Sequence, residues 1–200
     1  QMGGVTGALR SGAKLENVTS NVDLTITGNN VGGIVGYNGT TNLTISGCNN
    51  NIDATISGVN QVGGILGQAA ATSHTEMSPA TGITITPDVT ITGCNNYGQV
   101  TGTTHYVGGI IGLSNKCALL IENAYNGGII TTTKTTCGAI AGCLNGDAAS
   151  RGYITFSGVT YLTGTCNQAY TVNTTNQTAG HIDLNVDDCI EVDAEVESGV

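Results

Sequence analysis

The chain has 200 residues, a formal net charge of -9, and only 10% charged residues against 39% hydrophobic ones. The acidic balance argues against nucleic acid as a partner, because phosphate backbones would be repelled, and no segment approaches the roughly eighteen apolar residues needed to insert into a membrane. Abundant Val, Ile, Thr, Asn and Gly at low charge argue against a disordered chain and favour strands.

A hexapeptide with adjacent small residues recurs five times. The copies are Met2–Gly7, Val31–Gly36, Val62–Gly67, Val107–Gly112 and Cys137–Gly142, and their second residues are 29, 31, 45 and 30 positions apart. A fixed period of this length predicts a solenoid or a propeller. Because the first residues lie in the middle of a repeat, we expect a fragment or a processed mature chain that has lost any secretion signal.

Each repeat holds three runs of strand-forming residues, which in the second repeat are Val31–Gly36, Asn42–Cys48 and Ile52–Gly58. Equivalent positions keep their size in four columns: Leu15, Ile45, Ile91, Ile121 and Phe156; Val18, Cys48, Cys94, Ala124 and Val159; Ile26, Ile56, Val100 and Ile130; Ile34, Ile65, Ile110 and Ile140. The pattern predicts an all-β, right-handed parallel β-helix of about five rungs of roughly 30 residues, with three short strands per rung. A propeller is the alternative, but its blades usually need four strands and about forty residues.

The long step of 45 residues contains an insertion, Gln68–Gly82, which we expect to be a loop. The predicted organisation is a β-helix domain over residues 1–165 and a C-terminal capping or assembly segment over residues 166–200.

The glycine-containing strands look apolar on both faces, since an outer face opposes the Ile34 column. The residues of this outer face are Val31, Val35, Val62, Leu66, Val107 and Ile111. Two interpretations are open: the chain covers the face itself, with the 68–82 insertion or the C-terminal segment, or the face is a lateral interface with another subunit or domain. A phosphate-binding glycine loop is disfavoured, because no helical pattern follows any copy.

In the tail, apolar residues alternate with acids, which predicts one or two amphipathic strands. The apolar residues are Ile182, Leu184, Val186, Ile190 and Val192. The tail is predicted either to cap the last rung or to pair with the next subunit by strand addition. The acids lack the spacing of a calcium loop.

The chain has seven cysteines, so not all can pair internally. The candidates for disulfides in an oxidising compartment are Cys117, Cys137, Cys143, Cys166 and Cys189, and free buried thiols are the other interpretation. No close pair with metal-ligand spacing occurs, and we expect no metal and no cofactor.

Other functions have weaker support. Asp23 and Asp53 share a predicted column, as paired carboxylates of a glycosidase would, but the next rung replaces them. The three histidines lie in separate turns or the tail. A column of Thr27, Ser57, Thr101 and Thr131 resembles an ice-binding ladder, although threonine is also an ordinary exposed strand residue.

The run Val-Gly-Gly-Ile-Val-Gly, followed by Ile-Ser-Gly-Cys-Asn-Asn, resembles the GLUG-motif repeats of bacterial and protist surface proteins and adhesins over residues 1 to about 165. The resemblance implies a β-helical fold at the cell surface or outside the cell, with no catalytic residues to carry over. We therefore predict a non-catalytic structural or adhesive module, which assembles with homotypic subunits or neighbouring domains and binds glycans as a further option. The alternative is a carbohydrate-binding or carbohydrate-cleaving β-helix.

Overall fold

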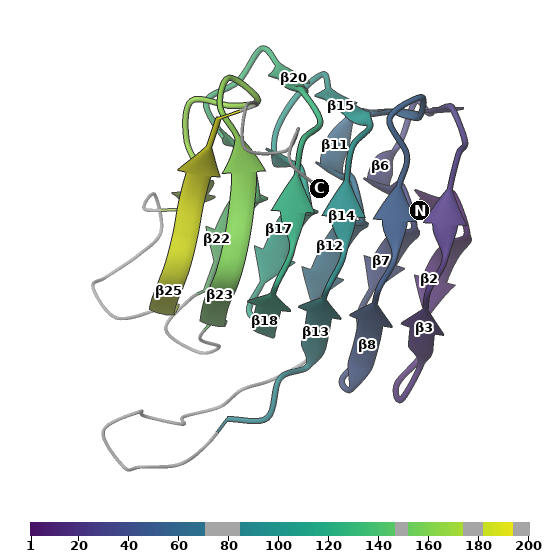
Figure 1. Cartoon of the computed structure of the whole chain (residues 1–200). Coiled ribbons are helices and arrows are strands. Elements are labelled where there is room, and N and C mark those ends of the chain that lie inside the picture. The colour runs from purple at the N-terminus through teal and green to yellow at the C-terminus, as the bar shows by residue number, and fades with distance from the viewer. Residues whose placement is uncertain (71–84, 147–151, 174–181, 194–200) are drawn as a thin grey trace.

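The computed structural model describes residues 1–70, 85–146, 152–173 and 182–193. Over these residues the regular elements are strands, without a helix. Strands are paired in parallel, each with the equivalent strand of the neighbouring repeat. The predicted all-β class is confirmed, and the arrangement of parallel strands side by side is β-helix-like (Figure 1).

The strands form four parallel sheets. The largest contains β3 (Lys14–Glu16), β8 (Leu43–Ser46), β13 (Val89–Thr92), β18 (Ala118–Glu122), β23 (Gly152–Leu162) and β25 (Ile182–Val192), with a second arm of β4 (Thr19–Ser20), β9 (Asn49–Asn50), β14 (Asn95–Asn96) and β19 (Tyr125–Asn126). Another contains β2 (Thr6–Leu9), β7 (Val35–Asn38), β12 (Leu66–Ala70), β17 (Ile111–Asn115), β22 (Ala141–Asn145) and β24 (Tyr170–Val172). A third contains β1 (Met2–Gly3), β6 (Asn29–Gly32), β11 (Asn60–Gly63), β16 (Val107–Gly108) and β21 (Cys137–Gly138), and the fourth β5 (Leu24–Thr25), β10 (Thr55–Gly58), β15 (Gln99–Gly102) and β20 (Ile130–Thr132).

Each full repeat contributes five short strands, where the sequence predicted three. In the second repeat these are β6, β7, β8, β9 and β10. The predicted first strand is broken by a bend at Gly33 and Ile34, and the second is broken at Gly47. Each of the first two predicted runs therefore contains a corner, the third begins before its strand at Thr55, and β9 lies outside all three runs.

The corner at Gly47 is repeated in every layer by a residue in the left-handed backbone region. These residues have φ of 50° to 59° and are Asn17, Gly47, Gly93, Asn123, Gly158 and Asp188. Glycine adopts this conformation without a Cβ penalty, and Asn and Asp tolerate it better than other residues do. The column explains why Gly, Asn or Asp recurs at this corner in the sequence.

Two buried clusters fill the interior. The larger lies between the two biggest sheets and includes Ile34, Ile45, Ile91 and Phe156. The predicted column from Leu15 to Phe156 is confirmed by direct in-register pairing. The smaller cluster lies between the other two sheets and contains Val31, Ile56, Val62, Val100 and Val107.

The predicted outer face of the glycine strands is buried by the chain itself. Val31, Val62 and Val107 are 0% exposed within the smaller cluster, and Val35, Leu66 and Ile111 are 0% exposed within the larger one. Alternation of side chains along a straight strand predicted the wrong face, because the bend at Gly33 and Ile34 turns the side chains of Ile34 and Val35 toward the same core. The six residues offer no lateral interface. Strands β10 and β15 cover the three valines of the smaller cluster, and β8, β13 and β18 cover the three residues of the larger one. The predicted cover was the insertion or the tail.

The register of the first repeat also differs from the prediction. Leu24 pairs with Ile56, and Thr25 pairs with Ser57, so the offset is 32 residues and the predicted positions Ile26 and Thr27 are displaced. Asp23 is displaced likewise, and its carboxylate accepts a hydrogen bond of 2.9 Å from the Thr55 amide. The paired-carboxylate column of Asp23 and Asp53 is therefore absent from this register.

The predicted insertion begins later than expected, because Gln68–Ala70 belong to β12. Residues 71–82 of that prediction lie outside the described residues.

Candidate functional site: the end face at β25

The tail continues the parallel stack. Strand β25 pairs with β23 at ten positions, with Leu184 beside Ile154 and Val186 beside Phe156. Strand β24 pairs with β22 in the same way, although its register shifts between Ala141 and Leu144. The strands on either side of residue 165 thus belong to the same sheets.

Strand β25 is an edge. In the part of the chain that the structure describes, β23 is its one partner, so the backbone groups along its other side have no strand to pair with. An open edge of this length is a template for a further strand. The sequence identified the strand from its alternation, and its parallel pairing gives it this exposed position.

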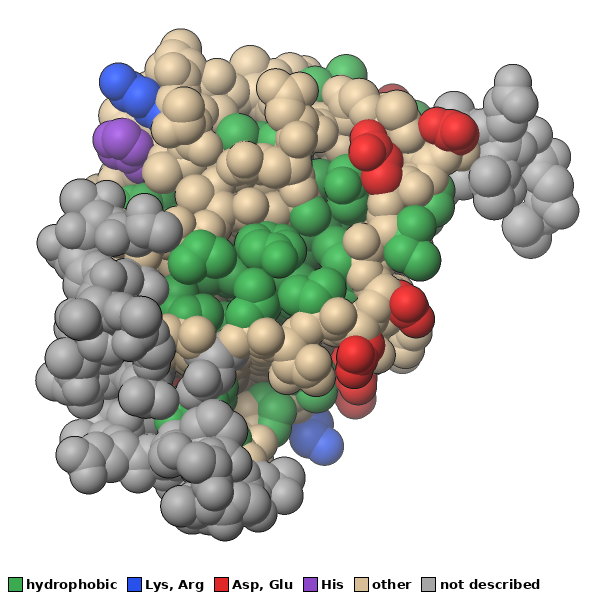
Figure 2. Space-filling model, turned by 90° about the vertical axis from the view of Figure 1, so that its left-hand side faces the viewer, with side chains coloured by type: hydrophobic (Ala, Val, Ile, Leu, Met, Phe, Trp, Pro, Cys, Tyr) green, Lys and Arg blue, Asp and Glu red, His purple; other side chains and the backbone are tan. Residues whose placement is uncertain are grey.

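Apolar side chains gather over this end of the larger core. They are partly buried, pack against it and form what we call the end face, which comprises Tyr161, Tyr170, Val172, Ile182, Leu184, Val186 and Cys189. Figure 2 shows the molecule from this side, with hydrophobic side chains in the middle and acidic ones along one margin. Phe156 and Tyr170 lie in an edge-to-face arrangement with ring centroids 5.6 Å apart, which anchors β24 to the core.

The tail residues predicted as an interface divide into two groups. Ile182, Leu184, Val186 and Val192 are half-buried, whereas Ile190 is 50% exposed. The sequence analysis did not identify Tyr170 and Val172 as members of this face. The signal that could have found them is spacing, since Tyr170 lies 29 residues, or one period, after Ala141.

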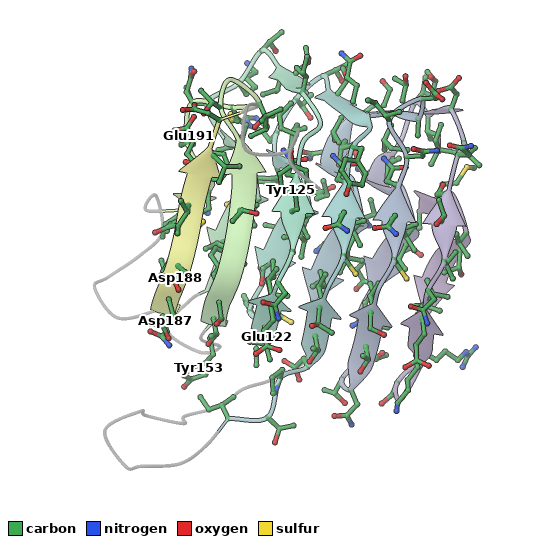
Figure 3. The ribbon with its side chains drawn as sticks, viewed as in Figure 1. Glu122, Tyr125, Tyr153, Asp187, Asp188 and Glu191 are labelled. Atoms are coloured by element: carbon green, nitrogen blue, oxygen red, sulfur yellow. The ribbon has the colours of Figure 1, made fainter. Side chains whose placement is uncertain are left out.

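Acidic side chains follow the same strand. Asp187, Asp188 and Glu191 are exposed and lie along β25 in Figure 3, whereas Glu122 lies on β18, two layers back. The strand thus places Leu184 and Val186 toward the core and these three acidic side chains toward solvent.

The opposite end of the stack carries a matching set. Leu9, Ala13, Leu15 and Val18 are also partly buried hydrophobic residues that pack against the larger core. In chain order Leu15 and Val186 terminate the same column, because the pairing runs from Leu15 through Ile45, Ile91, Ile121 and Phe156 to Val186. Both ends thus present the same column positions.

The candidate disulfide cysteines are all unpaired, and the structure separates them by burial. Cys117 and Cys143 are buried, and Cys137, Cys166 and Cys189 are half-buried. Burial raises the pKa of Cys143 to about 12, and burial together with the nearby Asp88 raises that of Cys117 well above its ordinary value. Such thiols are poor nucleophiles.

The remaining candidate chemistry is sparse. The ring of His105 lies 3.2 Å from the Thr136 hydroxyl, and His74 and His181 are outside the described residues. Across residues 1–70, 85–146, 152–173 and 182–193, no cluster of three or more His, Cys, Asp or Glu side chains is placed to hold a metal ion. Over the same ranges, the structure has no helix long and apolar enough to cross a membrane.

A cavity of about 510 Å³ lies beside the starts of β18, β23 and β25. Its lining is mainly apolar, with Tyr153, Thr155 and Asn185 as polar members. Figure 3 shows Tyr153 at the start of β23. A mainly apolar hollow with a few polar groups is the usual form of a small-ligand site.

Fold and end face together define an all-β protein of stacked parallel strands with an open terminal edge. No protein-family model matches the chain, and no curated protein matches it. One solved structure is similar, that of a protein described as a putative immunoglobulin A1 protease from Bacteroides ovatus, with 22% sequence identity and a TM-score of 0.62. The likeness covers 98% of this chain and 56% of the neighbour, so this chain spans little more than half of that protein's length. At this identity the likeness concerns the fold alone.

Proposed function

We propose that the chain is a non-catalytic extracellular structural or adhesive module, built as one right-handed solenoid of about five rungs. In this proposal copies of the chain stack head to tail, with the N-terminal end of one copy on the end face of the next. The predicted GLUG-motif resemblance, and the surface location that it implies, belong to the same proposal.

The observation that carries the proposal is the continuity of columns between the two ends. Stacking would place Leu15 of one copy on Val186 of the next, and Val18 on Cys189, as successive repeats already stack within the chain. Each aliphatic side chain buried in this way contributes about 1.5–3 kcal/mol. Because the two surfaces differ, the contact is heterologous and extends into a filament unless it closes.

Charge is partly complementary across this contact. Two of the five basic residues, Arg10 and Lys14, lie in the first repeat, and the exposed acids Asp187, Asp188 and Glu191 lie on β25. The strict register sets Glu16 against Asp187, because both extend one column. Like charges on neighbouring strands oppose pairing, so this position weakens the association.

Replacing Val186 with Asp is expected to weaken self-association at least roughly 100-fold, because a carboxylate would be buried against Leu15 of the next copy. Sedimentation velocity over a concentration series, with electron microscopy of the same sample, measures the effect. Ile52→Asp is the control: Ile52 is 72% exposed and belongs to the second repeat, so it is in neither end layer of the stack.

A mixing experiment distinguishes stacking from misfolding. Val186→Asp retains an intact N-terminal end and Leu15→Asp retains an intact end face, so each alone should be monomeric and an equimolar mixture should form dimers that do not extend. Monomers in the mixture, or in the natural chain at high concentration, would contradict the proposed assembly.

Removing the like-charge contact tests the register. Glu16→Lys is expected to strengthen association by about 3–10-fold at low salt, with the gain falling as salt is added. Glu16→Gln should give a smaller gain. Unchanged or weaker association of the lysine variant would rule out this register.

The second candidate is a carbohydrate-binding or carbohydrate-cleaving module, favoured by the cavity beside Tyr153. Depletion of the chain by insoluble glycans, and release of sugar from them, test it, and Tyr153→Ala should abolish either effect. Incubation with immunoglobulin A1 tests the activity named for the structural neighbour. We expect no cleavage, because at 22% identity the likeness to that neighbour concerns the fold alone.

A further inference from the structure

Two of the seven thiols lie side by side. The Sγ atoms of Cys137 and Cys166 are 3.5 Å apart, although the residues are 29 positions apart in the chain. Cys137 begins β21, and Cys166 comes from the segment between β23 and β24. The side chains of Cys48 and Cys94 are also in contact, but both of these thiols are buried.

Hydrogen bonds from neighbouring side chains and backbone hold the pair. The Gln168 side-chain amide and the Thr171 hydroxyl both donate to the Cys137 carbonyl, at 2.7 Å each. The Ala139 amide donates to the Gln168 carbonyl at 2.8 Å. These contacts fix the segment that carries Cys166 against the strand that carries Cys137.

The thiols are also accessible. Both line a cavity of about 400 Å³, whose wall includes Lys134, Thr165 and Gln168. Each is half-buried, whereas Cys48, Cys94, Cys117 and Cys143 are buried. A small reagent therefore reaches this pair more readily than those four thiols.

The ionisation of the pair is asymmetric. The hydrogen bond with Cys137, and then backbone amides including that of Gln168, hold the pKa of Cys166 below its ordinary value, while the same contact raises that of Cys137. Cys166 is thus the more acidic thiol of the pair, and the thiolate is the reactive form.

We propose that Cys137 and Cys166 are a modification site, at which a low-molecular-weight disulfide such as oxidised glutathione converts the two thiols into an intramolecular disulfide. The Cys166 thiolate attacks one sulfur of glutathione disulfide, which forms a mixed disulfide and releases one glutathione thiolate. Cys137 then loses its proton to solvent and attacks the Cys166 Sγ, which releases the second glutathione. Two protein thiols are oxidised and one glutathione disulfide is reduced to two thiols. The sulfurs need to approach by about 1.5 Å, since a disulfide bond is about 2.05 Å long.

The bond would fasten the last layer of the stack. The segment that follows Cys166 includes β24, whose pairing with β22 is short and irregular. Closing a loop of this length restricts the unfolded chain, so the oxidised protein is expected to melt roughly 5–10 °C higher than the reduced protein. The inference is independent of head-to-tail stacking, because it concerns contacts within one chain.

The test uses the full chain, equilibrated in glutathione buffers of increasing oxidised fraction, alkylated and digested for mass spectrometry. We expect a linked peptide pair containing Cys137 and Cys166, with the other thiols alkylated after unfolding, and a rise in melting temperature over the same range. In the reduced protein, iodoacetamide at neutral pH should label Cys166 before Cys189, whose pKa is raised by burial.

The variants separate the bond from general destabilisation. Cys137→Ser and Cys166→Ser should each melt at the same temperature in oxidised and reduced buffers, while Cys189→Ser should keep the full difference. The proposal is overturned if both thiols remain alkylatable in oxidised protein, if a different pair is linked, or if the doubly substituted protein keeps the oxidation-dependent rise.

Discussion

Replacing Asn96 with alanine is expected to lower the free energy of unfolding by about 3–5 kcal/mol. Asn96 is 0% exposed, and its side-chain amide donates to the Gly98 carbonyl at 2.9 Å and to the Asn126 side-chain oxygen at 2.7 Å. Its own oxygen accepts from the Asn50 amide at 2.8 Å. Alanine would leave polar groups on both neighbours without these partners in a buried environment, and each unsatisfied group costs about 1–3 kcal/mol.

The measurement is urea denaturation followed by circular dichroism. Asn95→Ala is the matched control, because Asn95 is the adjacent residue of β14, is only half-buried and makes an equivalent bond of 2.9 Å to Asn49. We expect it to cost about 1 kcal/mol. Asn50, Asn96 and Asn126 form a buried column of bonded amides, the inner asparagine ladder. Equal effects of the two substitutions would show that burial does not set the contribution of this ladder to the free energy of unfolding.

The inner asparagine ladder was not predicted from the sequence, because asparagine between strands usually indicates a turn. The pair Asn49–Asn50 lies between two predicted runs, and so does its equivalent Asn95–Asn96, at positions where Asn usually indicates a turn. In a parallel stack with a fixed period, however, identical amides lie one layer apart and bond to one another. The aliphatic columns were predictable for the same reason, since like residues at one period must meet.

What failed were inferences that assumed straight strands and a constant period. Val35 was assigned to an outer face by alternation from Ile34, but the Gly-Gly bend sends both into the larger core. Leu24 occupies the place predicted for Ile26, because the corner between Asn50 and Ile56 in the second repeat is two residues longer than the corner before Leu24. Cys137 and Cys166 have the same 29-residue offset as Ala141 and Tyr170, but Cys166 lies outside the strands, so the predicted columns did not include it.

The adjacent glycines of the hexapeptide have a specific steric cause. A Cβ on Gly109 would lie 2.1 Å from the Ala139 carbonyl oxygen of the next layer and 2.3 Å from the Asn126 Cγ. Gly64 meets its equivalents in the same way, at 2.2 Å from the Gly109 oxygen and 2.3 Å from the Asn96 Cγ. The second glycine is therefore required wherever a stacked carbonyl and a ladder asparagine both approach it.

We accordingly expect Gly109→Ala to destabilise the protein by at least about 4 kcal/mol, more than the usual 1–3 kcal/mol for overpacking, because the opposing atoms are backbone or belong to the buried ladder and have nowhere to move. Gly28→Ala is the control: its nearest neighbour would be the Ile26 Cγ2 at 3.3 Å, and we expect a change within about 1 kcal/mol. Melting temperature and urea denaturation of both variants measure the difference.

The last hexapeptide supports this steric cause, because it carries Ala139 in place of the second glycine. In that layer the column that holds Asn126 continues as Tyr161, so no ladder amide approaches the alanine. A Gly109→Ala protein as stable as the Gly28→Ala protein would show that the layers can separate at this point, and that close backbone stacking is not what fixes the glycine pair.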